Sequence, residues 1–496
     1  MQSAAPSAYD QGLSLSAAGR HLEAITRFEM ALAEKPDDSR ALFALGNTAR
    51  ALGMAEAAEQ FFRQVLALEP ARLEAAVNLA NLLRARGQFG AAISLLEPAL
   101  ARAPDSPELH LTLGSALRES GDAKGAVEAY RAALAIRPDF VPALVSLADM
   151  LCDAGARGEA RALYDRAVAL EPKNAQARLN RAILHFLSGD LKAGWRDYAA
   201  RLEIPGKIAP TALTLPLWRG ENLKGKRLLV RAEQGVGDQI LFASLFADLI
   251  ARAAQERGSV ILECEPRLVP LLARSFPGAA VRPAVMTGRD ADYGWLKAAG
   301  GANLAAAMGS LPRIFRPRIE SFPTQHTFLL PDADEIARWK AAFGPGAIGI
   351  CWRSGKAGGH RAAQYAPLAA WGEFLRGLPG AIVSVQYDAR PDEIAALEQI
   401  SGRPILVPPG IDQKQELDRA AALLSALEVV ATAPTAVAWL AAGSGTRTLK
   451  LLYDTSWTAL GQPHEPFAPS CLCVMPETPG DWRETFAKAK ALIARP

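Results

Sequence analysis

The chain of 496 residues has little cysteine and no long hydrophobic run. Its five cysteines are scattered, and only Cys471 and Cys473 lie close together, without a matching Cys or His pair that would favour a metal site. No window approaches the roughly 18 uninterrupted apolar residues that a membrane helix needs. We therefore expect reduced thiols, no metal ion and no contact with a membrane.

Long runs of charge of one sign are also absent, and the formal net charge is only +3. Proteins that hold nucleic acid through phosphate contacts usually carry a basic patch or tail, so nucleic acid is not an expected partner. Met1–Asp10 has neither a basic stretch nor an apolar core, so no signal peptide is predicted there. Together these absences predict a cytoplasmic protein.

The first two hundred residues repeat with a period of 34 residues. Prolines, glycines, alanines and bulky residues each recur at this spacing. The prolines are Pro36, Pro70, Pro104, Pro138 and Pro172; the glycines are Gly19, Gly53, Gly87, Gly121, Gly155 and Gly189; the alanines are Ala24, Ala58, Ala92, Ala126 and Ala160; the bulky residues are Phe28, Phe62, Leu96, Tyr130, Tyr164 and Tyr198. Each unit predicts a helix, a turn at the glycine, a second helix and a terminating proline.

This period and pattern resemble the tetratricopeptide repeat (TPR). Roughly five stacked repeats are expected from Ala4 to about Pro172, with a degenerate helix pair, Ala175–Arg201, as the C-terminal cap. The concave face of such an array usually binds a peptide or protein. Four polar residues on first helices are candidates for partner binding, although they are equally compatible with an ordinary solvated helix surface: Asn47, Asn78, Asn81 and Arg84.

After a linker rich in Pro and Gly at residues 204–225, strand-like and helix-like segments alternate. Short connections between them favour parallel sheets covered by helices on both faces, in two doubly wound domains. The expected strands are Arg227–Ala232, Val260–Cys264, Ala347–Trp352, Ala381–Gln386, Ile405–Val407, Glu428–Thr432 and Leu449–Asp454. The expected helices are Gln239–Arg257, Pro266–Ser275, Ala333–Phe343, Leu368–Leu378, Pro391–Ile400, Lys414–Ala426, Thr435–Gly443 and Asp481–Ala494.

The first candidate loop, Glu233–Asp238, links a predicted strand to a predicted helix. Gly235 and Gly237 are expected to allow backbone angles and close approaches that a side chain would block. The amides that open the helix then face an anionic ligand, with the Asp238 carboxylate beside it. The alternative for Asp238 is that it only caps the helix.

The second candidate loop follows the strand that ends near Trp352. It brings together guanidinium, ammonium, imidazole and hydroxyl groups among glycines, a combination that suits a phosphate. The alternative is a basic surface loop. Its candidate ligand-binding residues are Arg353, Ser354, Lys356, His360 and Arg361.

The third candidate loop, Thr432–Trp439, joins another strand to a helix. Pro434 fixes the first turn and Thr432 is a plausible cap, so that Thr432, Pro434 and Thr435 surround amides that attract an anion. An ordinary capped strand–helix junction is the alternative. Gln386, at the end of a further strand, is a candidate contact to a base or sugar.

Three stretches together resemble the bacterial TPR-fused glycosyltransferases, whose catalytic half is similar to the heptosyltransferases. They are Pro216–Trp218 with Lys226–Asp238, Trp352–Gly355, and Thr435–Gly443. The resemblance implies the GT-B architecture of two Rossmann-like domains, without a metal ion. It gives a multidomain chain: a TPR solenoid at 1–203, a linker at 204–225, an acceptor-side domain at 226–330 and a nucleotide-sugar domain at 331–496.

The stretch 360–367 is most similar to the flagellin-modifying members of this group. The resemblance then implies transfer of a nonulosonic acid, such as a pseudaminic-type sugar, from its CMP form to Ser or Thr of flagellin. Asp238 matches the general base. Arg353, Ser354 and Lys356 match the loop that neutralises the donor phosphate. No cofactor is implied beyond this donor substrate.

Two residues depart from the pattern of the relatives. Pro434 stands where relatives have Asp, and Trp439 where they have His. Either the donor differs from an ADP- or other NDP-sugar, which favours a CMP-sugar, or the transferase half is inactive and the protein is a TPR adaptor. A third alternative is an enzyme of this fold that acts on a lipid or polysaccharide.

Overall fold

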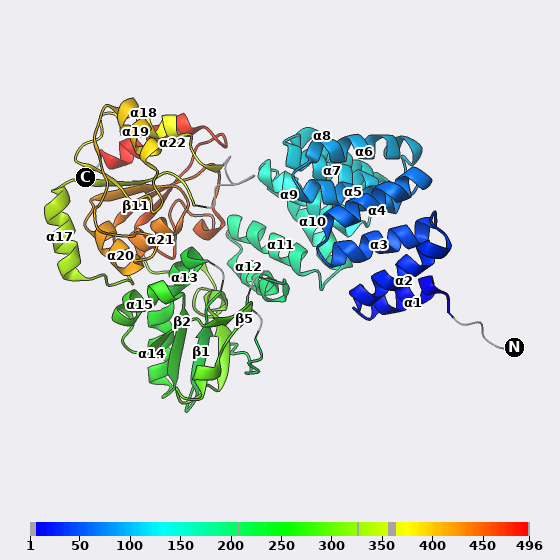
Figure 1. Ribbon diagram of the computed structural model, residues 1–496. Coiled ribbons are helices and arrows are strands. Elements are labelled where there is room, and N and C mark those ends of the chain that lie inside the picture. Colours follow the sequence, from blue (N-terminus) through cyan, green and yellow to red (C-terminus); the bar gives the residue numbers. More distant parts are fainter. Residues whose placement is uncertain are drawn as a thin grey trace. The chain divides into compact units, whose positions relative to one another are not determined.

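The computed structural model describes residues 6–206, 208–209, 211–233, 235–324, 327–355 and 364–494. It divides into two compact units, Met1–Ala177 and Arg178–Pro496, with the boundary inside a helix. The sequence places this boundary at residue 203. The units are described separately below (Figure 1).

The first unit is a stack of antiparallel helix pairs, each made of two consecutive helices. The first helices of the pairs are α1 (Ala8–Ala17), α3 (Ser39–Ala51), α5 (Leu73–Ala85), α7 (Pro107–Ser120) and α9 (Val141–Asp153). The second helices are α2 (His21–Glu34), α4 (Ala55–Leu68), α6 (Phe89–Arg102), α8 (Ala123–Ile136) and α10 (Arg157–Leu170). These bounds confirm the five predicted helix pairs.

The repeating residues have the structural roles that their spacing predicts. All six repeat glycines have φ between 73° and 96°, a left-handed conformation that glycine adopts without strain. The five repeat alanines are fully buried, and so are the bulky residues from Phe28 to Leu96. The bulky residue of each second helix packs on its own first helix: a Cβ atom on Gly46 would lie 2.7 Å from the Phe62 ring.

The second unit begins with a sixth helix pair, α11 (Ala175–Leu187) and α12 (Leu191–Tyr198), followed by the short helix η1 (Ala199–Glu203). Its first sheet is parallel, in the order β3-β2-β1-β6. The strands are β1 (Arg227–Arg231), β2 (Ser259–Cys264), β3 (Ala280–Pro283) and β6 (Leu304–Ala307). A small hairpin, β4 (Met286–Thr287) with β5 (Asp290–Ala291), lies between β3 and β6 in the chain.

The second sheet is also parallel and has the order β12-β11-β10-β7-β8-β9. Renumbered from its own first strand, this is the 3-2-1-4-5-6 order of doubly wound sheets. The strands are β7 (Ile348–Cys351), β8 (Ile382–Ser384), β9 (Ile405–Leu406), β10 (Val429–Thr432), β11 (Arg447–Leu451) and β12 (Cys471–Val474).

Helices connect the strands of both sheets. With the first sheet are α13 (Val236–Ala243), α14 (Phe246–Gln255), η2 (Pro266–Leu268), α15 (Val269–Ser275), η3 (Gly294–Leu296), η4 (Met308–Ser310), α16 (Pro312–Phe315) and η5 (Ile319–Ser321). With the second are α17 (Ala333–Phe343), α18 (Leu368–Leu375), α19 (Pro391–Ser401), α20 (Leu417–Ser425), α21 (Ala436–Gly443), η7 (Trp457–Ala459) and α22 (Trp482–Ile493).

All seven predicted strands are present within two or three residues of their predicted ends. One predicted helix, Gln239–Arg257, is wrong in its continuity, because α13 ends at Ala243 and α14 begins at Phe246. The predicted linker is also more ordered than expected. Trp218 donates its backbone N–H to Ala305 O (2.8 Å), so the segment extends the first sheet beyond β6.

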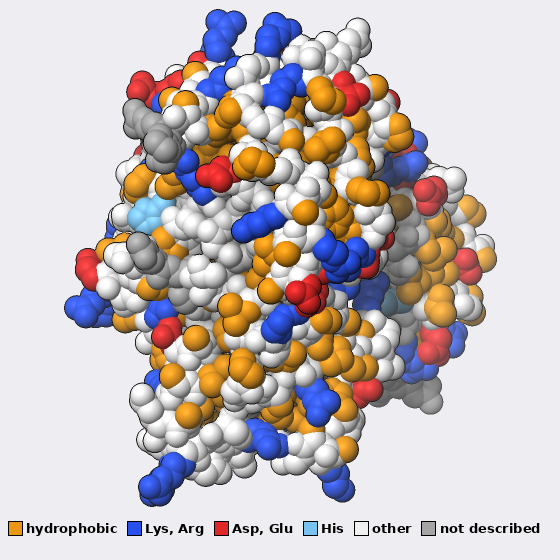
Figure 2. Space-filling model, turned by 90° about the vertical axis from the view of Figure 1, so that its left-hand side faces the viewer, with side chains coloured by type: hydrophobic (Ala, Val, Ile, Leu, Met, Phe, Trp, Pro, Cys, Tyr) orange, Lys and Arg blue, Asp and Glu red, His pale blue; other side chains and the backbone are white. Residues whose placement is uncertain are grey.

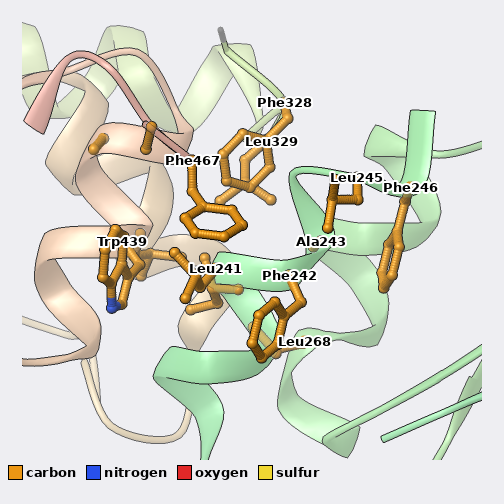
Figure 3. Close-up of a cluster of buried hydrophobic side chains, with 14 of the residues drawn as sticks. Leu241, Phe242, Ala243, Leu245, Phe246, Leu268, Phe328, Leu329, Trp439 and Phe467 are labelled. Carbon is orange, nitrogen blue, oxygen red and sulfur yellow. The ribbon is translucent and has the colours of Figure 1, made fainter. Parts of the chain in front are cut away.

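One hydrophobic core joins the two sheets and the sixth helix pair within the second unit. Figure 3 shows Leu241 of α13 pointing toward Trp439 of α21 and Phe467. The Phe467 ring also contacts Phe242 and Trp195, with centroid distances of 6.1 and 6.3 Å. On the face drawn in Figure 2, basic, acidic and apolar side chains are interspersed, as the small net charge predicts.

Candidate functional site

The second sheet reverses its strand order between β7 and β10, and ligands of doubly wound sheets bind outside the carboxyl ends of strands at such a point. The second candidate loop follows β7 and the third follows β10. Gln386 lies just beyond β8, the neighbour of β7. The described parts of these predicted segments therefore converge on one edge of the sheet.

Gln386 holds the second loop in place and is not free to read a base. Its side chain is buried, and its Oε1 accepts the backbone N–H groups of Trp352 and Arg353, both at 3.0 Å. Its Nε2 donates to Arg353 O (3.0 Å) and to Asp388 Oδ1 (2.7 Å). In this structure, the amide fixes the loop and does not face a ligand.

Arg353 is also fully engaged by neighbouring acidic groups. Its Nε and Nη2 form a bidentate pair with Glu393 at 2.7 and 2.8 Å, and its Nη1 donates to Asp388 Oδ1 at 3.0 Å. These hydrogen bonds and charges outweigh burial and raise the pKa of Arg353 above its usual value. The guanidinium therefore shapes the loop, and its charge is already neutralised by two carboxylates.

The third loop forms a capped helix start. Thr435 is the N-cap of α21 and its hydroxyl accepts the Val437 N–H at 3.3 Å, while Thr432 is completely buried below it. The cap is therefore Thr435, and the prediction of Thr432 as the cap is wrong. Pro434 is exposed, as a residue that borders a ligand site should be. The first amides of α21 lack intrahelical partners, as in any helix.

Asp238 lies in the first turn of α13, at the carboxyl end of β1. Its Oδ2 accepts the backbone N–H of Gly235 at 3.4 Å, so it does cap the helix. The glycines differ from expectation, because Gly235 has φ −89° and Gly237 is not among the residues with positive φ. A Cβ atom on Gly235 would have no neighbour closer than Asp238 Oδ2 at 3.9 Å.

The starts of α13 and α21 lie side by side. A Cβ atom on Gly237 would be 3.4 Å from Trp439 Cδ1 and 3.5 Å from Ala436 Cα. Both helices begin at carboxyl ends of parallel strands, one in each sheet. The positive ends of two helix dipoles are thus close together, an arrangement that favours an anion.

Trp439 has a structural role that sequence reasoning missed. Lys450 Nζ lies 4.8 Å from the centroid of its ring. The same ammonium donates to Ser456 Oγ at 2.9 Å and forms a buried ion pair with Glu465. Burial would lower the pKa of Lys450, but the Glu465 carboxylate outweighs burial and the pKa is raised. Trp439 therefore covers a buried charge.

A second buried carboxyl lies at the end of β2. Glu263 Oε2 accepts the Ala232 N–H and the Tyr293 hydroxyl, both at 2.9 Å, and Tyr293 in turn accepts from Arg231 Nε at 2.9 Å. Burial raises the pKa of Glu263 above its usual value, and these two hydrogen bonds offset only part of that effect. The sequence gave no signal for this cluster, because its residues are far apart in the chain.

The partner-binding candidates of the first unit form a polar ladder along the first helices. Asn78 Nδ2 donates to Asn47 Oδ1 at 3.0 Å. Arg84 donates to Asn81 Oδ1 at 2.7 Å and forms a bidentate pair with Glu119 at 2.9 and 2.7 Å. Their common face is thus confirmed, while a bound partner stays a prediction.

Ser354 lies in the second loop between Arg353 and Gly355, and it is half-buried there. Three further candidates, Lys356, His360 and Arg361, lie outside the described residues. Within the described ranges, no group of His, Cys, Asp and Glu side chains is arranged to hold a metal ion. The helices described here include none that is long and apolar enough to cross a bilayer. The described cysteines, all five, are free thiols.

Comparison with known proteins identifies the repeats. A family model described as tetratricopeptide repeat matches residues 9–72, 77–139 and 146–211, and a second matches residues 117–168. The chain therefore contains TPR repeats, and the match includes the sixth helix pair. Repeats of this kind generally mediate contacts between proteins.

Similar proteins match mainly through part of their length. Protein FlbA of Caulobacter vibrioides is 34% identical over 334 residues, which are 64% of this chain and 55% of FlbA. The chain thus spans about half of this relative. The TPR protein TTC0263 of Thermus thermophilus is 29% identical, with 36% of this chain and 98% of that chain covered and a TM-score of 0.32. PilF of Pseudomonas aeruginosa is 19% identical, with coverages of 40% and 91% and a TM-score of 0.36.

Proposed function

We propose that the protein is a metal-independent glycosyltransferase of GT-B architecture. It transfers a nonulosonic acid of the pseudaminic type from its CMP form to Ser or Thr of flagellin, which its TPR repeats recruit. The observation that carries this proposal is the pairing of α13 with α21, which sets Asp238 of one parallel sheet beside the anion-attracting helix start of the other.

The chemistry needs a proton acceptor and a charge stabiliser at one place. Asp238 accepts the proton of the acceptor hydroxyl as its oxygen bonds to the anomeric carbon and CMP departs. The amides at the starts of α13 and α21 stabilise the phosphate charge that develops on the leaving group. Arg353 and Gln386 support this site by fixing the loop after β7.

The test is the intact mass of flagellin co-expressed with the protein and a pathway that makes a CMP-nonulosonate. We expect a ladder of sugar increments with the unchanged protein and none with Asp238→Ala. Asp238→Asn separates base from cap, because the Asn side chain still offers an oxygen to the Gly235 N–H. A fully active Asn variant would show that Asp238 is only a cap.

The internal pairing of Arg353 favours a second candidate, a TPR adaptor whose transferase half is inactive. The two carboxylates on Arg353 and the residues Pro434 and Trp439 leave the described part of the site with little positive side-chain charge. For an adaptor, flagellin co-purifies with the protein and keeps its unmodified mass. Flagellin that neither binds nor gains mass contradicts both candidates.

A further inference from the structure

A buried ion pair joins the sixth helix pair to the loop that carries Asp238. Arg201, in η1, donates from Nε and Nη2 to the two carboxylate oxygens of Glu233 at 2.9 and 2.7 Å. Both side chains are at most 2% exposed. Glu233 begins the first candidate loop, two residues after the end of β1.

Other contacts complete the surroundings of this pair. Arg201 also donates to Tyr198 O at 3.2 Å and to Ser310 Oγ at 3.0 Å, and its guanidinium lies 4.5 Å from the centroid of the Tyr198 ring. Glu233 Oε1 accepts the Gly309 N–H at 2.5 Å. All the polar contacts of the pair thus come from three elements: η1, the loop after β1, and η4 after β6.

These elements meet at the point where the first sheet reverses its strand order. The chain runs from β1 outward to β3 and then returns to β6 on the other side of β1. In a doubly wound sheet, a ligand usually occupies the crevice at such a point. Here Arg201 and Glu233 fill the position between the carboxyl ends of β1 and β6, so the protein supplies its own occupant.

The occupant comes from a repeat. By sequence, the sixth helix pair belongs to the TPR match that extends to residue 211. By packing, it belongs to the second unit, which begins at Arg178. A repeat has therefore become part of the support of the candidate catalytic loop.

We propose that Arg201 is a positioning residue that sets the start of α13, and with it Asp238, through its pair with Glu233. This inference rests on the proposed function for its catalytic meaning. Replacing a buried ion pair by apolar groups is often neutral for stability, whereas the bidentate geometry of Arg fixes a carboxylate in direction and distance. The pair therefore fixes a geometry that general burial would leave free.

The test uses the full-length protein with three sets of changes. Arg201→Met with Glu233→Gln removes both charges but keeps an acceptor for the Gly309 N–H. Arg201→Lys keeps the charge and loses the bidentate contact. Arg181→Met is the matched control, because Arg181 pairs α11 with α12 through Asp197 at 2.6 Å.

Two readouts are measured on each variant: amide hydrogen exchange of residues 232–243, and the kcat and KM of sugar transfer to flagellin. For the double variant, we expect a thermal midpoint near that of the unchanged protein and exchange in this segment about tenfold faster. We expect kcat to fall about tenfold or more with an unchanged KM for flagellin. Arg201→Lys should be intermediate, and Arg181→Met should change neither readout.

Wild-type exchange and kcat in the double variant would overturn the inference and leave the pair a simple part of the core. An equal loss in Arg181→Met would do the same, since any damage to the helix pair would then suffice. If the unchanged protein transfers no sugar to flagellin, the proposed function fails. Hydrogen exchange of residues 232–243 then still decides whether Arg201 positions the loop.

Discussion

At the scale of single residues, the glycines at the start of α13 indicate where a ligand lies. Gly237 is in a helix and has ordinary van der Waals room for a Cβ atom, 3.4 Å from its nearest neighbour. Folding alone would favour alanine there, because glycine loses more conformational freedom. A glycine that the fold does not need is explained by a ligand that approaches the backbone closely.

Gly237→Ala should therefore separate stability from activity. We expect the variant to be as stable as the unchanged protein or more stable by about 0.4–1 kcal/mol. Sugar transfer should fall about ten- to hundredfold, because the new methyl group displaces the ligand. Thermal melting and the mass of flagellin measure the two effects. Gly90→Ala, with open space around its Cβ, is the control and should keep full transfer. Full transfer by Gly237→Ala would contradict the ligand position.

Glu263 is the residue with the clearest dependence on pH. Its folded pKa lies above its usual value of 4.5 because burial disfavours the carboxylate. Between these two pKa values the folded state binds more protons than the unfolded state, so stability falls as pH rises. The neutral Tyr293 hydroxyl and the Arg231 guanidinium face the group without removing this effect.

Glu263→Gln should gain stability over the unchanged protein as pH rises from about 4 to about 7, because the amide never has to ionise. Urea unfolding of both proteins at several pH values measures this difference. Glu256→Gln is a control of opposite sign, since hydrogen bonds to the Leu223 N–H and Arg252 lower the pKa of Glu256. A stability difference for Glu263→Gln that is constant with pH would show that the carboxyl ionises normally in the folded state.

The chemistry of single residues could be predicted only in part from the sequence. The positions of Asp238 and Thr435 at helix starts followed from strand–loop–helix patterns. The engagement of Arg353 did not, because its carboxylate partners Asp388 and Glu393 lie 35 and 40 residues further on. Local patterns show which groups a loop carries, while their partners depend on tertiary folding.

At the scale of elements, the repeat depends on contacts between small and aromatic residues within each helix pair. Gly12, Gly46 and Gly114 lie where a Cβ atom would come within 2.7 Å of an aromatic ring carbon of the second helix. The rings themselves are buried and have no room to move outward. Each pair can therefore pack closely only with glycine at this position or with a smaller partner.

Gly46→Ala tests this packing. The new Cβ atom would lie 2.7 Å from Phe62 Cε1, and we expect a loss of about 1–3 kcal/mol in the stability of the first unit. Urea unfolding followed by far-ultraviolet circular dichroism measures it. Gly158→Ala, at a helix position with open space, should instead stabilise by about 0.4–1 kcal/mol. Equal effects of the two changes would show that the Phe62 ring yields.

Elements with strong periodicity were predictable, and those defined by their neighbours were not. The strand β6 has the sequence Leu304–Ala307, three of whose residues are alanine, a helix former. It becomes a strand because β1 on one side and Pro216–Trp218 on the other supply hydrogen-bond partners. Tertiary pairing overrides propensity there.

At the scale of the whole molecule, the end of the repeat pattern and the end of the first unit do not coincide. The sixth helix pair packs on the catalytic half: Phe186 and Tyr198 contact Trp457 at centroid distances of 5.5 and 5.6 Å. Trp195 donates its Nε1–H to Arg316 O at 2.9 Å. The sequence could not reveal this, because the repeat ladder continues through Gly189 and Tyr198 without interruption.

Shortened chains test where the second unit begins. A chain that starts at Lys173 keeps the sixth helix pair and should melt cooperatively. A chain that starts at Ile204 loses Phe186, Trp195 and Tyr198, each a large buried side chain whose removal from a core costs about 3–5 kcal/mol.

Together these losses approach the total stability of a domain, about 5–15 kcal/mol, and Glu233 would also be left as a buried charge without Arg201. We therefore expect the chain from Ile204 to be insoluble or to melt without a cooperative transition. Soluble yield and thermal melting measure this, with the full-length protein as control. Equal cooperative melting of the two shortened chains would instead place the boundary at residue 203. Loss of transfer after removal of residues 1–200 then could not be assigned to partner recruitment unless a chain from Lys173 behaved differently, because only the longer deletion removes support from the loop of Asp238.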